Sequence, residues 1–442
     1  MRLSRRATAV GAATVLAASL AACGSSGPTG SGNGGGQAGG KGLLIWALTG
    51  GDQKVFQDSA ARFNKENPGQ NAQVQVFQND PYKQKLHVSL GSNQPPDVFE
   101  NWGGGILKSY VDSGAVKDIT DAWKGDAAWS NKFFPNVVQS ATFGGKVYGV
   151  PMNSIQPEVF FYNKDVFAKA GVQPPQTWDQ LLSAVQTLKS KGIAPISLGG
   201  QGKWPELLYL QYLADRVGGP QLFDNVLAGK KDAWLDPGFV TAATMIQQLI
   251  DAGAFVKGYA SISFDTGQSR ALVYTGKAAM ELMGSWQYFG IKTDEPSFIQ
   301  QKKLGWFPFP TVPAGKGDPR DITGNPANFY SVSSKSANPD GAVKYLQTQL
   351  TSDQYIKDLI QVGEVPAVQG IESQLQQSEN ADWLTYVYQT VKNAPHFQLS
   401  WDQALPPAQT DTLLTNIDKL FLKQITPQQF CQNMNAAAGG KS

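Results

Sequence analysis

The chain has 442 residues, with 37 Lys and Arg against 35 Asp and Glu, so its formal net charge is +2. Hydrophobic residues make up 41% of the chain, which is typical of globular domains, and the scattered basic residues argue against a nucleic-acid partner. With only two Cys and two His, neither a disulfide framework nor a zinc site is expected, and no metal or cofactor is predicted.

The first residues predict export from the cell. Three arginines (Arg2, Arg5 and Arg6) precede an apolar run, Ala7 to Leu20, which is too short to span a bilayer as a mature helix. Residues 1–22 are therefore predicted to be a signal peptide, with the general and twin-arginine export routes both open. The sequence Leu20-Ala21-Ala22-Cys23 resembles the bacterial lipobox, in which the cysteine is acylated. Cys23 is the expected lipidation site, and an ordinary signal peptide cleaved near Ala22 is the alternative.

Residues 23–41 are predicted to be a flexible tether, because they are rich in Gly and contain almost no large apolar side chain. The segment contains a formal G-x-G-x-x-G match at residues 30–35. No strand precedes that match and no helix follows it, so it does not predict a phosphate-binding loop.

The remaining residues, about 400, exceed what one core usually supports, so two domains are expected. Strands and helices alternate from the start of this part, as in a doubly wound α/β domain. The expected strands are 43–46, 74–77 and 97–99, with helices from residue 55 and over 82–90.

The same alternation resumes after residue 158. The expected strands there are 159–162, 193–198, 278–283 and 328–333, and the expected helices are 164–170, 177–191, 206–217, 238–252 and 266–275. From Pro339 the chain is predicted to be mostly helical. The break at 151–157, with Pro151 and Pro157, is predicted to be the first crossing from one domain to the other.

Catalytic signatures are missing from the sequence. It has no G-x-S-x-G, H-E-x-x-H or G-x-x-x-x-G-K-[ST] motif, and each of its two histidines stands without a cysteine beside it. A glycosidase needs only two carboxylates across a cleft, so that alternative stays open, with Asp97, Glu100, Glu158 and Asp402 as candidate carboxylates.

Several tryptophans lie at expected strand ends beside Gly, Asn or Gln, where open α/β sheets bind ligands. Trp102, Trp204 and Trp286 are of this kind, and Trp401 is a further candidate. An indole offers a flat surface for the apolar face of a sugar ring. Burying roughly 100 Å² of apolar area there is worth about 2–3 kcal/mol.

A resemblance to a known family supports this interpretation. The sequences 145-GKVYGVP-151, 161-FYNK-164 and 175-PQTWD-179 resemble the signature of extracellular sugar-binding proteins of ABC importers. The similarity continues through 96-PDVF-99 and 363-GEVPA-367. The segments 102-WGGG-105 and 197-SLGGQGKWP-205 look closest to actinobacterial members for xylobiose and related oligosaccharides.

The resemblance implies a two-lobe α/β fold of the periplasmic-binding-protein kind, with a hinge and a ligand cleft between the lobes. We assign residues 42–152 and 311–366 to the N-terminal lobe, and residues 153–310 and 367–442 to the C-terminal lobe. By position within the family pattern, the ligand-binding residues are expected to be Thr49, Asp52, Asn101, Trp102, Asn153, Gln156, Gln201, Lys203, Trp204, Trp286, Asn328 and Trp401. The segment 97–106 departs from the loop of maltose-type members.

The sequence therefore predicts a monomeric binding protein rather than an enzyme. We expect it on the extracellular face of the cytoplasmic membrane, attached only through its N-terminal lipid anchor. Its expected partners are an oligosaccharide, with xylobiose as the best candidate, and the permease subunits of an ABC transporter. The alternatives are a secreted glycoside hydrolase and a binding protein for a non-sugar solute.

Overall fold

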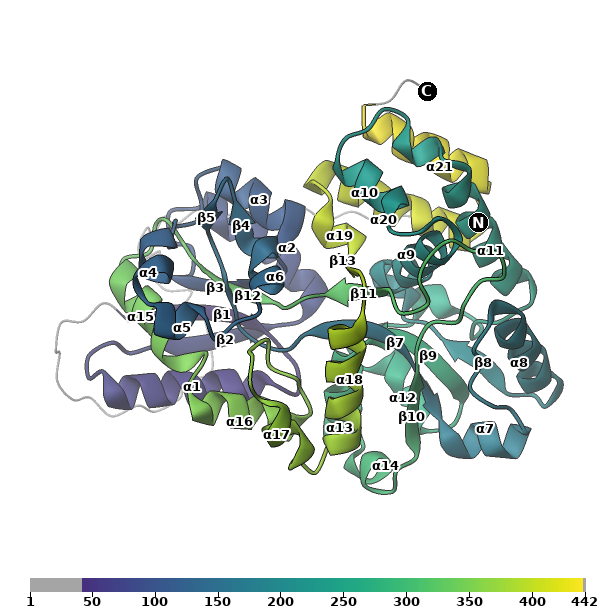
Figure 1. The fold of residues 1–442 in the computed structure, drawn as a ribbon, viewed down its shortest axis with the longest axis horizontal. Coiled ribbons are helices and arrows are strands. Elements are labelled where there is room, and N and C mark those ends of the chain that lie inside the picture. The colour runs from purple at the N-terminus through teal and green to yellow at the C-terminus, as the bar shows by residue number, and fades with distance from the viewer. Residues whose placement is uncertain (1–41, 440–442) are drawn as a thin grey trace, which may run out of the picture. The chain divides into compact units, whose positions relative to one another are not determined.

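The computed structural model describes residues 42–439, so the predicted signal peptide, the tether and Cys23 lie outside the described residues. The described strands form two main β-sheets, each covered by helices (Figure 1). This arrangement confirms the expected α/β fold with two lobes. Within residues 42–439, none of the helices is both long and apolar enough to cross a membrane.

The sheet of the first lobe has the strand order β2-β1-β3-β12-β6. β1 is parallel to β2 and β3, whereas β12 is antiparallel to both β3 and β6. The strands are β1 (Leu44–Leu48), β2 (Gln73–Phe77), β3 (Val98–Asn101), β6 (Val150–Pro151) and β12 (Phe329–Val332). The three strands expected at 43–46, 74–77 and 97–99 are therefore present as β1, β2 and β3. A strand that begins at residue 329 completes the sheet.

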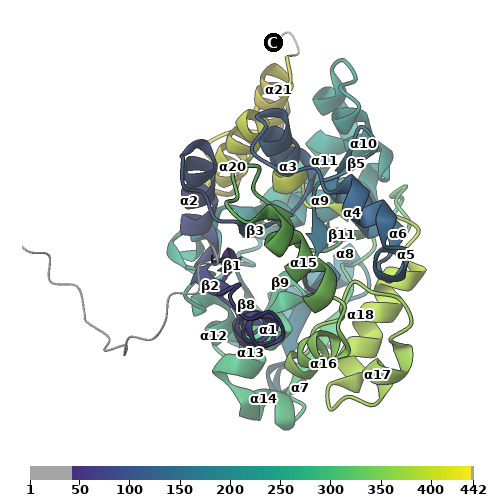
Figure 2. The same ribbon diagram turned by 90° about the vertical axis from the view of Figure 1, so that its left-hand side faces the viewer.

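Helices cover this sheet, and α1 buries Val55, Phe56, Ala60 and Phe63 on one face. α1 lies beside α15 and α16 (Figure 2). The helices of this lobe are α1 (Gln53–Glu66), α2 (Asn79–Gly91), α3 (Gly104–Asp112), α4 (Thr120–Gly125), α5 (Ala127–Ser130), α6 (Pro135–Val138), α15 (Pro339–Gln349) and α16 (Asp353–Val362), with a hairpin of β4 (Thr142–Phe143) and β5 (Lys146–Val147).

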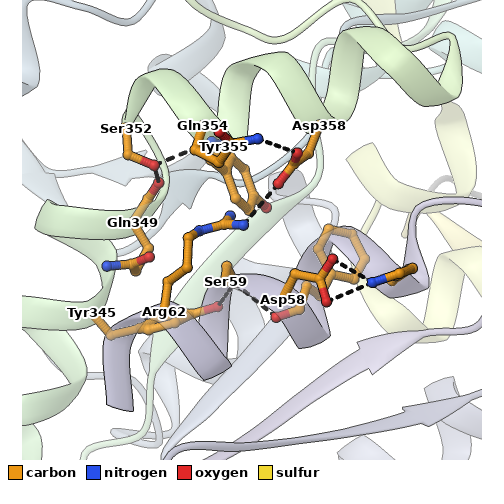
Figure 3. A network of polar contacts seen from close by, with 11 residues as sticks. Asp58, Ser59, Arg62, Tyr345, Gln349, Ser352, Gln354, Tyr355 and Asp358 are labelled. Atoms are coloured by element: carbon orange, nitrogen blue, oxygen red, sulfur yellow. Dashed lines mark hydrogen bonds and ion pairs between the residues drawn. The ribbon is translucent and has the colours of Figure 1, made fainter. Parts of the chain in front are cut away.

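Polar contacts join these helices across a long stretch of sequence (Figure 3). Arg62 of α1 pairs with Asp358 of α16 at 2.8 Å, and the Ser59 hydroxyl contacts the Tyr345 hydroxyl of α15 at 2.5 Å. The early α1 is therefore fixed by helices from the last quarter of the chain.

The sheet of the second lobe has the order β13-β11-β7-β9-β8, and β10 pairs with β7. β7 and β9 are antiparallel and form its buried centre, while β8 is parallel to β9. The strands are β7 (Gln156–Asn163), β8 (Ala194–Ser197), β9 (Ala278–Gly284), β10 (Leu304–Phe307), β11 (Ile322–Asn325) and β13 (Phe397–Leu399).

The helices of the second lobe include the C-terminal α20 and α21, which pack on α9 and α11 (Figure 1). They are α7 (Lys164–Ala170), α8 (Trp178–Ser190), α9 (Trp204–Gly218), α10 (Gln221–Leu227), α11 (Pro237–Asp251), α12 (Gln268–Tyr274), α13 (Trp286–Asp294), α14 (Pro296–Gln300), α17 (Glu372–Gln376), α18 (Ala381–Asn393), α19 (Trp401–Ala404), α20 (Pro407–Phe421) and α21 (Pro427–Ala437).

The chain passes between the two lobes along residues 152–155, 326–328 and 363–367, which we call the crossing segments. Hydrogen bonds join them side by side. The Met152 amide donates to the Asn328 carbonyl at 2.9 Å, and the Ile155 amide donates to the Val365 carbonyl at 3.0 Å. The Tyr355 hydroxyl of α16 also donates to the Met152 carbonyl at 2.6 Å.

Two details differ from the expected elements. Gln156 and Pro157, expected in the break between lobes, already belong to β7, and Pro157 pairs with Gly324 in register. Gly324 has a φ of 141°, and a Cβ there would lie 2.1 Å from the Gln156 carbonyl oxygen, so only glycine allows this close approach of β11 to β7. Residues 322–325, expected in the N-terminal lobe, form β11 of the second sheet instead.

Candidate functional site

A cavity of about 370 Å³ lies between residues of the two sheets and next to the crossing segments. Its lining residues come from strand ends, helix starts and the crossing segments of both lobes. They include Thr49, Asp52, Asn79, Lys83, Glu100, Trp102, Asn153, Gln156, Glu158, Trp204, Phe264, Asp265, Arg270, Trp286, Gln287, Phe289, Asp294, Asn325, Asn328, Ser400, Asp402 and Gln403.

The first-lobe wall is built from residues that follow β1 and β3. Thr49 and Asp52 lie in the turn between β1 and α1, and Trp102 follows β3 directly. The Lys83 ammonium of α2 lies 5.0 Å from the centre of the Trp102 ring, over its face. This places a cation–π contact at the edge of the cavity.

Glycine makes the turn after Trp102 possible. Gly104 has a φ of 60°, and a Cβ there would lie 2.6 Å from the Gln403 carbonyl oxygen of α19. The start of α3 therefore approaches α19 closely, which brings Trp102 and the α19 residues Asp402 and Gln403 to the same cavity.

The second-lobe wall is aromatic. Trp204 begins α9 and Trp286 begins α13, and their ring centres are 6.1 Å apart. Phe264 stands edge-on to Trp204 with ring centres 4.9 Å apart. The Ser285 amide donates to the Pro157 carbonyl at 2.9 Å, so the start of α13 is tied to β7.

The crossing segments and strand ends supply amides between the two walls. The Asn328 amide group donates from Nδ2 to the Glu100 carboxyl at 2.6 Å, and the Asn328 backbone N–H donates to Asn153 Oδ1 at 3.1 Å. Asn325 Nδ2 donates to Gln156 Oε1 at 3.4 Å. These bonds fix amides from three separate segments in one place.

Two lining carboxyls are held by the scaffold. Glu100 accepts from the Leu48 amide at 2.8 Å as well as from Asn328. Glu158 accepts from the Thr323 hydroxyl at 2.5 Å, from Ser400 at 3.1 Å and from Gln211 Nε2 at 3.2 Å. Both side chains are nearly fully buried.

Burial raises the pKa of each of these acids. Desolvation raises the pKa of Glu100 to about 8, with the Asp52 charge as the second cause, and the pKa of Glu158 to about 7. Desolvation also raises the pKa of Asp52 to about 6. Glu364, in a crossing segment, has a raised pKa because of desolvation and the charge of the neighbouring Asp52. The acids at this end of the cavity therefore lack a cation that would favour ionisation.

The two walls touch each other beside the cavity. A Cβ on Gly51 would lie 2.7 Å from a ring carbon of Phe289 and 2.9 Å from the Thr293 hydroxyl, both on α13. The Asp80 amide of α2 donates to the Asp265 carboxylate at 3.1 Å. The first-lobe turn and α2 thus meet second-lobe residues across the cavity.

Most of the expected ligand-binding residues line this cavity. They are Thr49, Asp52, Trp102, Asn153, Gln156, Trp204, Trp286 and Asn328, and they come from both lobes and two of the crossing segments. Whether they contact a ligand stays a prediction.

Four expected residues are not among those that line it. Asn101 is buried and its amide is used within the lobe, donating to Ser331 Oγ at 2.9 Å and accepting from the Gly103 amide at 3.0 Å. Gln201 is exposed, and the Lys203 ammonium lies 3.9 Å from the Asp418 carboxylate. Trp401 is fully buried and stacks on Phe223 with ring centres 4.2 Å apart.

Several lining residues were not expected from the sequence. They are Lys83, Phe264, Asp265, Arg270, Gln287, Phe289 and Asn325, whereas Glu100, Glu158 and Asp402 were expected only as candidate carboxylates of the hydrolase alternative. Glu100 and Glu158 lie at strand ends, and that position is the one signal in the sequence for them. The others reach the cavity through pairings between distant segments. Among the described residues, no group of three or more His, Cys, Asp and Glu is arranged to hold a metal ion.

Comparison with known proteins agrees with this architecture. The family model described as bacterial extracellular solute-binding protein matches residues 47–356. The diacetylchitobiose binding protein DasA of Streptomyces coelicolor is 27% identical over 381 residues, which cover 85% of this chain and 84% of that protein. The xylose/arabinose-binding protein XacG of Haloferax volcanii is 28% identical over 225 residues, covering 50% of this chain and 47% of XacG. For several of the curated relatives, the match spans between about half and two thirds of the relative's own length.

Solved structures show the same fold. One, described with xylan utilization by the thermophilic bacterium Caldanaerobius polysaccharolyticus, superposes with a TM-score of 0.80 at 30% identity, covering 90% of this chain and 99% of that one. A chitin oligosaccharide binding protein superposes with a TM-score of 0.80 at 24% identity, covering 90% and 98%.

Proposed function

We propose that this chain, which belongs to the bacterial extracellular solute-binding protein family, captures xylobiose or a short xylo-oligosaccharide outside the cell and delivers it to the permease of an ABC transporter. The observation that supports the sugar is the cavity between the lobes, where Trp102, Trp204 and Trp286 stand beside fixed amides. Indole faces fit the apolar faces of pyranose rings, and amides and carboxyls bind their hydroxyl groups.

The size of the cavity supports a short ligand. Its volume of about 370 Å³ lies near the lower end of the usual range for small-molecule sites. We therefore expect a disaccharide or a short oligosaccharide rather than a long chain.

Xylobiose is the first choice among short sugars for two reasons. The segments 102-WGGG-105 and 197-SLGGQGKWP-205 resemble members for xylobiose, and one similar structure comes from a xylan-utilizing bacterium. A chitin-type sugar is the main competitor, because the similarity to DasA and to a chitin oligosaccharide binding protein covers most of the chain.

The mechanism is a population shift rather than bond chemistry. A ligand that contacts both walls favours the state in which the walls meet, by as much as its affinities for the two states differ. The crossing segments allow such a movement, because they are the backbone links between the two sheets. The closed, loaded protein is then the form that the permease recognises. We further propose that acylated Cys23 and the tether hold a monomer at the outer face of the membrane.

A secreted glycoside hydrolase is the rival function, since Glu100, Glu158 and Asp402 all line the cavity. Asp97 does not, because its carboxylate accepts from the Leu44 amide at 2.8 Å and from Ser336 at 2.5 Å. Glu100 and Glu158 each accept hydrogen bonds from several scaffold donors. Incubation with xylo-oligosaccharides followed by product chromatography separates the two functions, and we expect no shortened product.

A thermal-shift screen of the purified protein with xylo-, cello-, malto-, chito- and galacto-oligosaccharides tests the proposal. We expect the largest shift with xylobiose, followed by a Kd on the order of micromolar in titration calorimetry. A shift with another series but not with xylo-oligosaccharides contradicts the choice of sugar. No shift with any series contradicts sugar binding.

A further inference from the structure

Charged side chains around the cavity are unevenly divided. Among the described residues that line it, the cations are Lys83 and Arg270. The lining carboxyls are Asp52, Glu100, Glu158, Asp265, Asp294 and Asp402. Acidic groups therefore outnumber basic groups in a chain whose total charge is nearly balanced.

Both lining cations are already paired with lining carboxylates. The Lys83 ammonium lies 3.4 Å from Asp402, and the Arg270 guanidinium lies 2.7 Å from Asp294. Neither cation is therefore free to neutralise an incoming anion without giving up its present partner, and that exchange would leave a carboxylate unpaired in a partly buried place.

The remaining four lining carboxyls, Asp52, Glu100, Glu158 and Asp265, form no ion pair with any described residue. The first three are nearly fully buried. Their raised pKa values, about 6, 8 and 7, follow from desolvation that no neighbouring cation offsets. A second anion in the cavity would raise them further, whereas a cation would lower them.

Three amide side chains of the cavity each have an oxygen without a hydrogen-bond partner. The side-chain nitrogens of Asn325, Asn328 and Gln287 donate to Gln156, Glu100 and Glu281. Their oxygens, Oδ1 of both asparagines and Oε1 of Gln287, have no hydrogen-bond partner among the described residues. All three side chains are more than nine-tenths buried, so a ligand that carries hydrogen-bond donors would satisfy them.

We propose that this cavity selects sugars by charge: it accepts neutral sugars, binds ammonium-bearing amino sugars at least as tightly, and excludes sugars that carry a carboxylate. The inference rests on the proposed sugar-binding function. It adds a rule about charge that holds whether the sugar is built from xylose or from glucose units. Hydroxyl and ammonium groups donate to the unpartnered oxygens, and an ammonium near the four carboxyls also favours their ionised form. The carboxylate of a uronic acid carries the same negative charge as the lining carboxylates. It also has only hydrogen-bond acceptors to present to the unpartnered amide oxygens.

Titration calorimetry with three disaccharides of one β-1,4-linked glucose skeleton tests the rule. Cellobiose is neutral, cellobiouronic acid carries one carboxylate, and the disaccharide of glucosamine carries two amino groups that accept protons near neutral pH. The titrations are made at pH 7, where a pKa of about 6 leaves Asp52 mostly ionised. We expect cellobiouronic acid to bind at least tenfold more weakly than cellobiose. The glucosamine disaccharide should bind at least as tightly as cellobiose, with an affinity that falls as salt is added, because salt screens charge interactions.

An Asp265→Asn variant checks that the charge around the cavity is the cause. An asparagine keeps an oxygen for the Asp80 amide while removing one carboxylate, so the affinity ratio between cellobiose and cellobiouronic acid should fall at least threefold. Asp340→Asn is the matched control. Asp340 is exposed in the first turn of α15 and does not line the cavity, so the same change in net charge should leave that ratio unaltered.

Equal affinities for cellobiose and cellobiouronic acid in the wild-type protein would overturn the rule. An equal fall of the affinity ratio in Asp265→Asn and Asp340→Asn would overturn it as well. A parallel titration with xylobiose separates this result from the proposed function. If xylobiose binds while charge has no effect, the function stands and the rule fails. If xylobiose does not bind but the charge series follows the expected order, the rule stands and the choice of xylobiose fails. Failure of every sugar overturns both.

Discussion

Some tryptophan side chains line the cavity, and others are packed in the hydrophobic core. Trp286 is half-buried, lines the cavity and packs over Gly284, where a Cβ would lie 2.1 Å from its ring. Trp401 is fully buried, stacked on Phe223 and edge-on to Trp234 with ring centres 5.7 Å apart. One side chain has a free surface for a ligand and the other has none.

Changing Trp286 to alanine should lower sugar affinity at least tenfold, or about 1.4 kcal/mol, because the stacking surface is lost. The Tm of the ligand-free protein should stay nearly unchanged, since part of the ring faces open space. Calorimetry and a melting curve measure both quantities. Unaltered affinity would remove Trp286 from the site.

Trp401→Ala is the opposite case. Removal of a fully buried tryptophan costs about 3–5 kcal/mol of unfolding free energy, so we expect a large fall in Tm in the absence of sugar. Denaturant unfolding measures the loss. A stable Trp401→Ala variant with weakened sugar binding would contradict the assignment of this indole to the core.

Glu206 makes stability depend on pH. It is fully buried at the start of α9, and neither carboxyl oxygen has a partner among the described residues. Desolvation, with the charge of Asp418 as a lesser cause, raises its pKa from 4.5 to about 9. The folded state therefore holds this proton more tightly than the unfolded state, and the resulting stability is present below pH 4.5 and lost as pH rises toward 9.

Glu206→Gln should accordingly remove part of this pH dependence. We expect the Tm values of variant and wild type to be similar near pH 4.5, and the variant to melt about 2 °C or more higher near pH 9. Melting curves across that range test the expectation. An equal Tm difference between variant and wild type at pH 4.5 and at pH 9 would contradict titration of Glu206 as the cause of that difference.

At the scale of elements, the turn between β1 and α1 must fit against α13. A Cβ at Gly51 would meet Phe289 and Thr293 there, so Gly51→Val should keep the two walls apart. We expect at least a tenfold loss of sugar affinity and a smaller ligand-induced decrease in radius of gyration by X-ray scattering. The ligand-free protein should melt normally.

Gly125→Ala is the control, because a Cβ at Gly125 would meet nothing within 4 Å and its φ is not positive. It should bind and contract like the wild type. Full closure of Gly51→Val with normal affinity would show that this contact is not needed in the bound state.

The elements that the sequence predicted are those with a strong local pattern. β1, β2 and β3 follow from short apolar runs, and α8 follows from Thr177, which accepts from the Gln180 amide at 3.3 Å as its N-cap. β11 and β13 were not predicted. They are short, contain Thr, Gly, Asn and Gln, and exist only because each pairs with a neighbour distant in sequence.

The site divides in the same way. Indoles beside glycine, such as Trp102 and Trp286, have a recognisable local context. Lys83 and Arg270 do not, because their positions depend on α2 and α12 meeting across the cavity. Trp401 has a local context like that of a site tryptophan, and its burial against α10 is a tertiary effect that the sequence does not show.

At the scale of the whole molecule, attachment to the membrane is proposed to depend on Cys23. Cys23→Ala should release the protein into the medium, because no acyl chain can then be attached, while sugar affinity stays unchanged. Fractionation of cells followed by immunoblotting measures the distribution. A variant that stays with the membrane would contradict lipid anchoring through this residue.

The position of β12 between β3 and β6 has a consequence for biosynthesis. Although the first lobe begins the chain, its sheet lacks a central strand until the ribosome has added residue 332. Until then β3 presents an unpaired edge, a known starting point for aggregation. A nascent chain of this design therefore stays without its complete N-terminal lobe through most of translation.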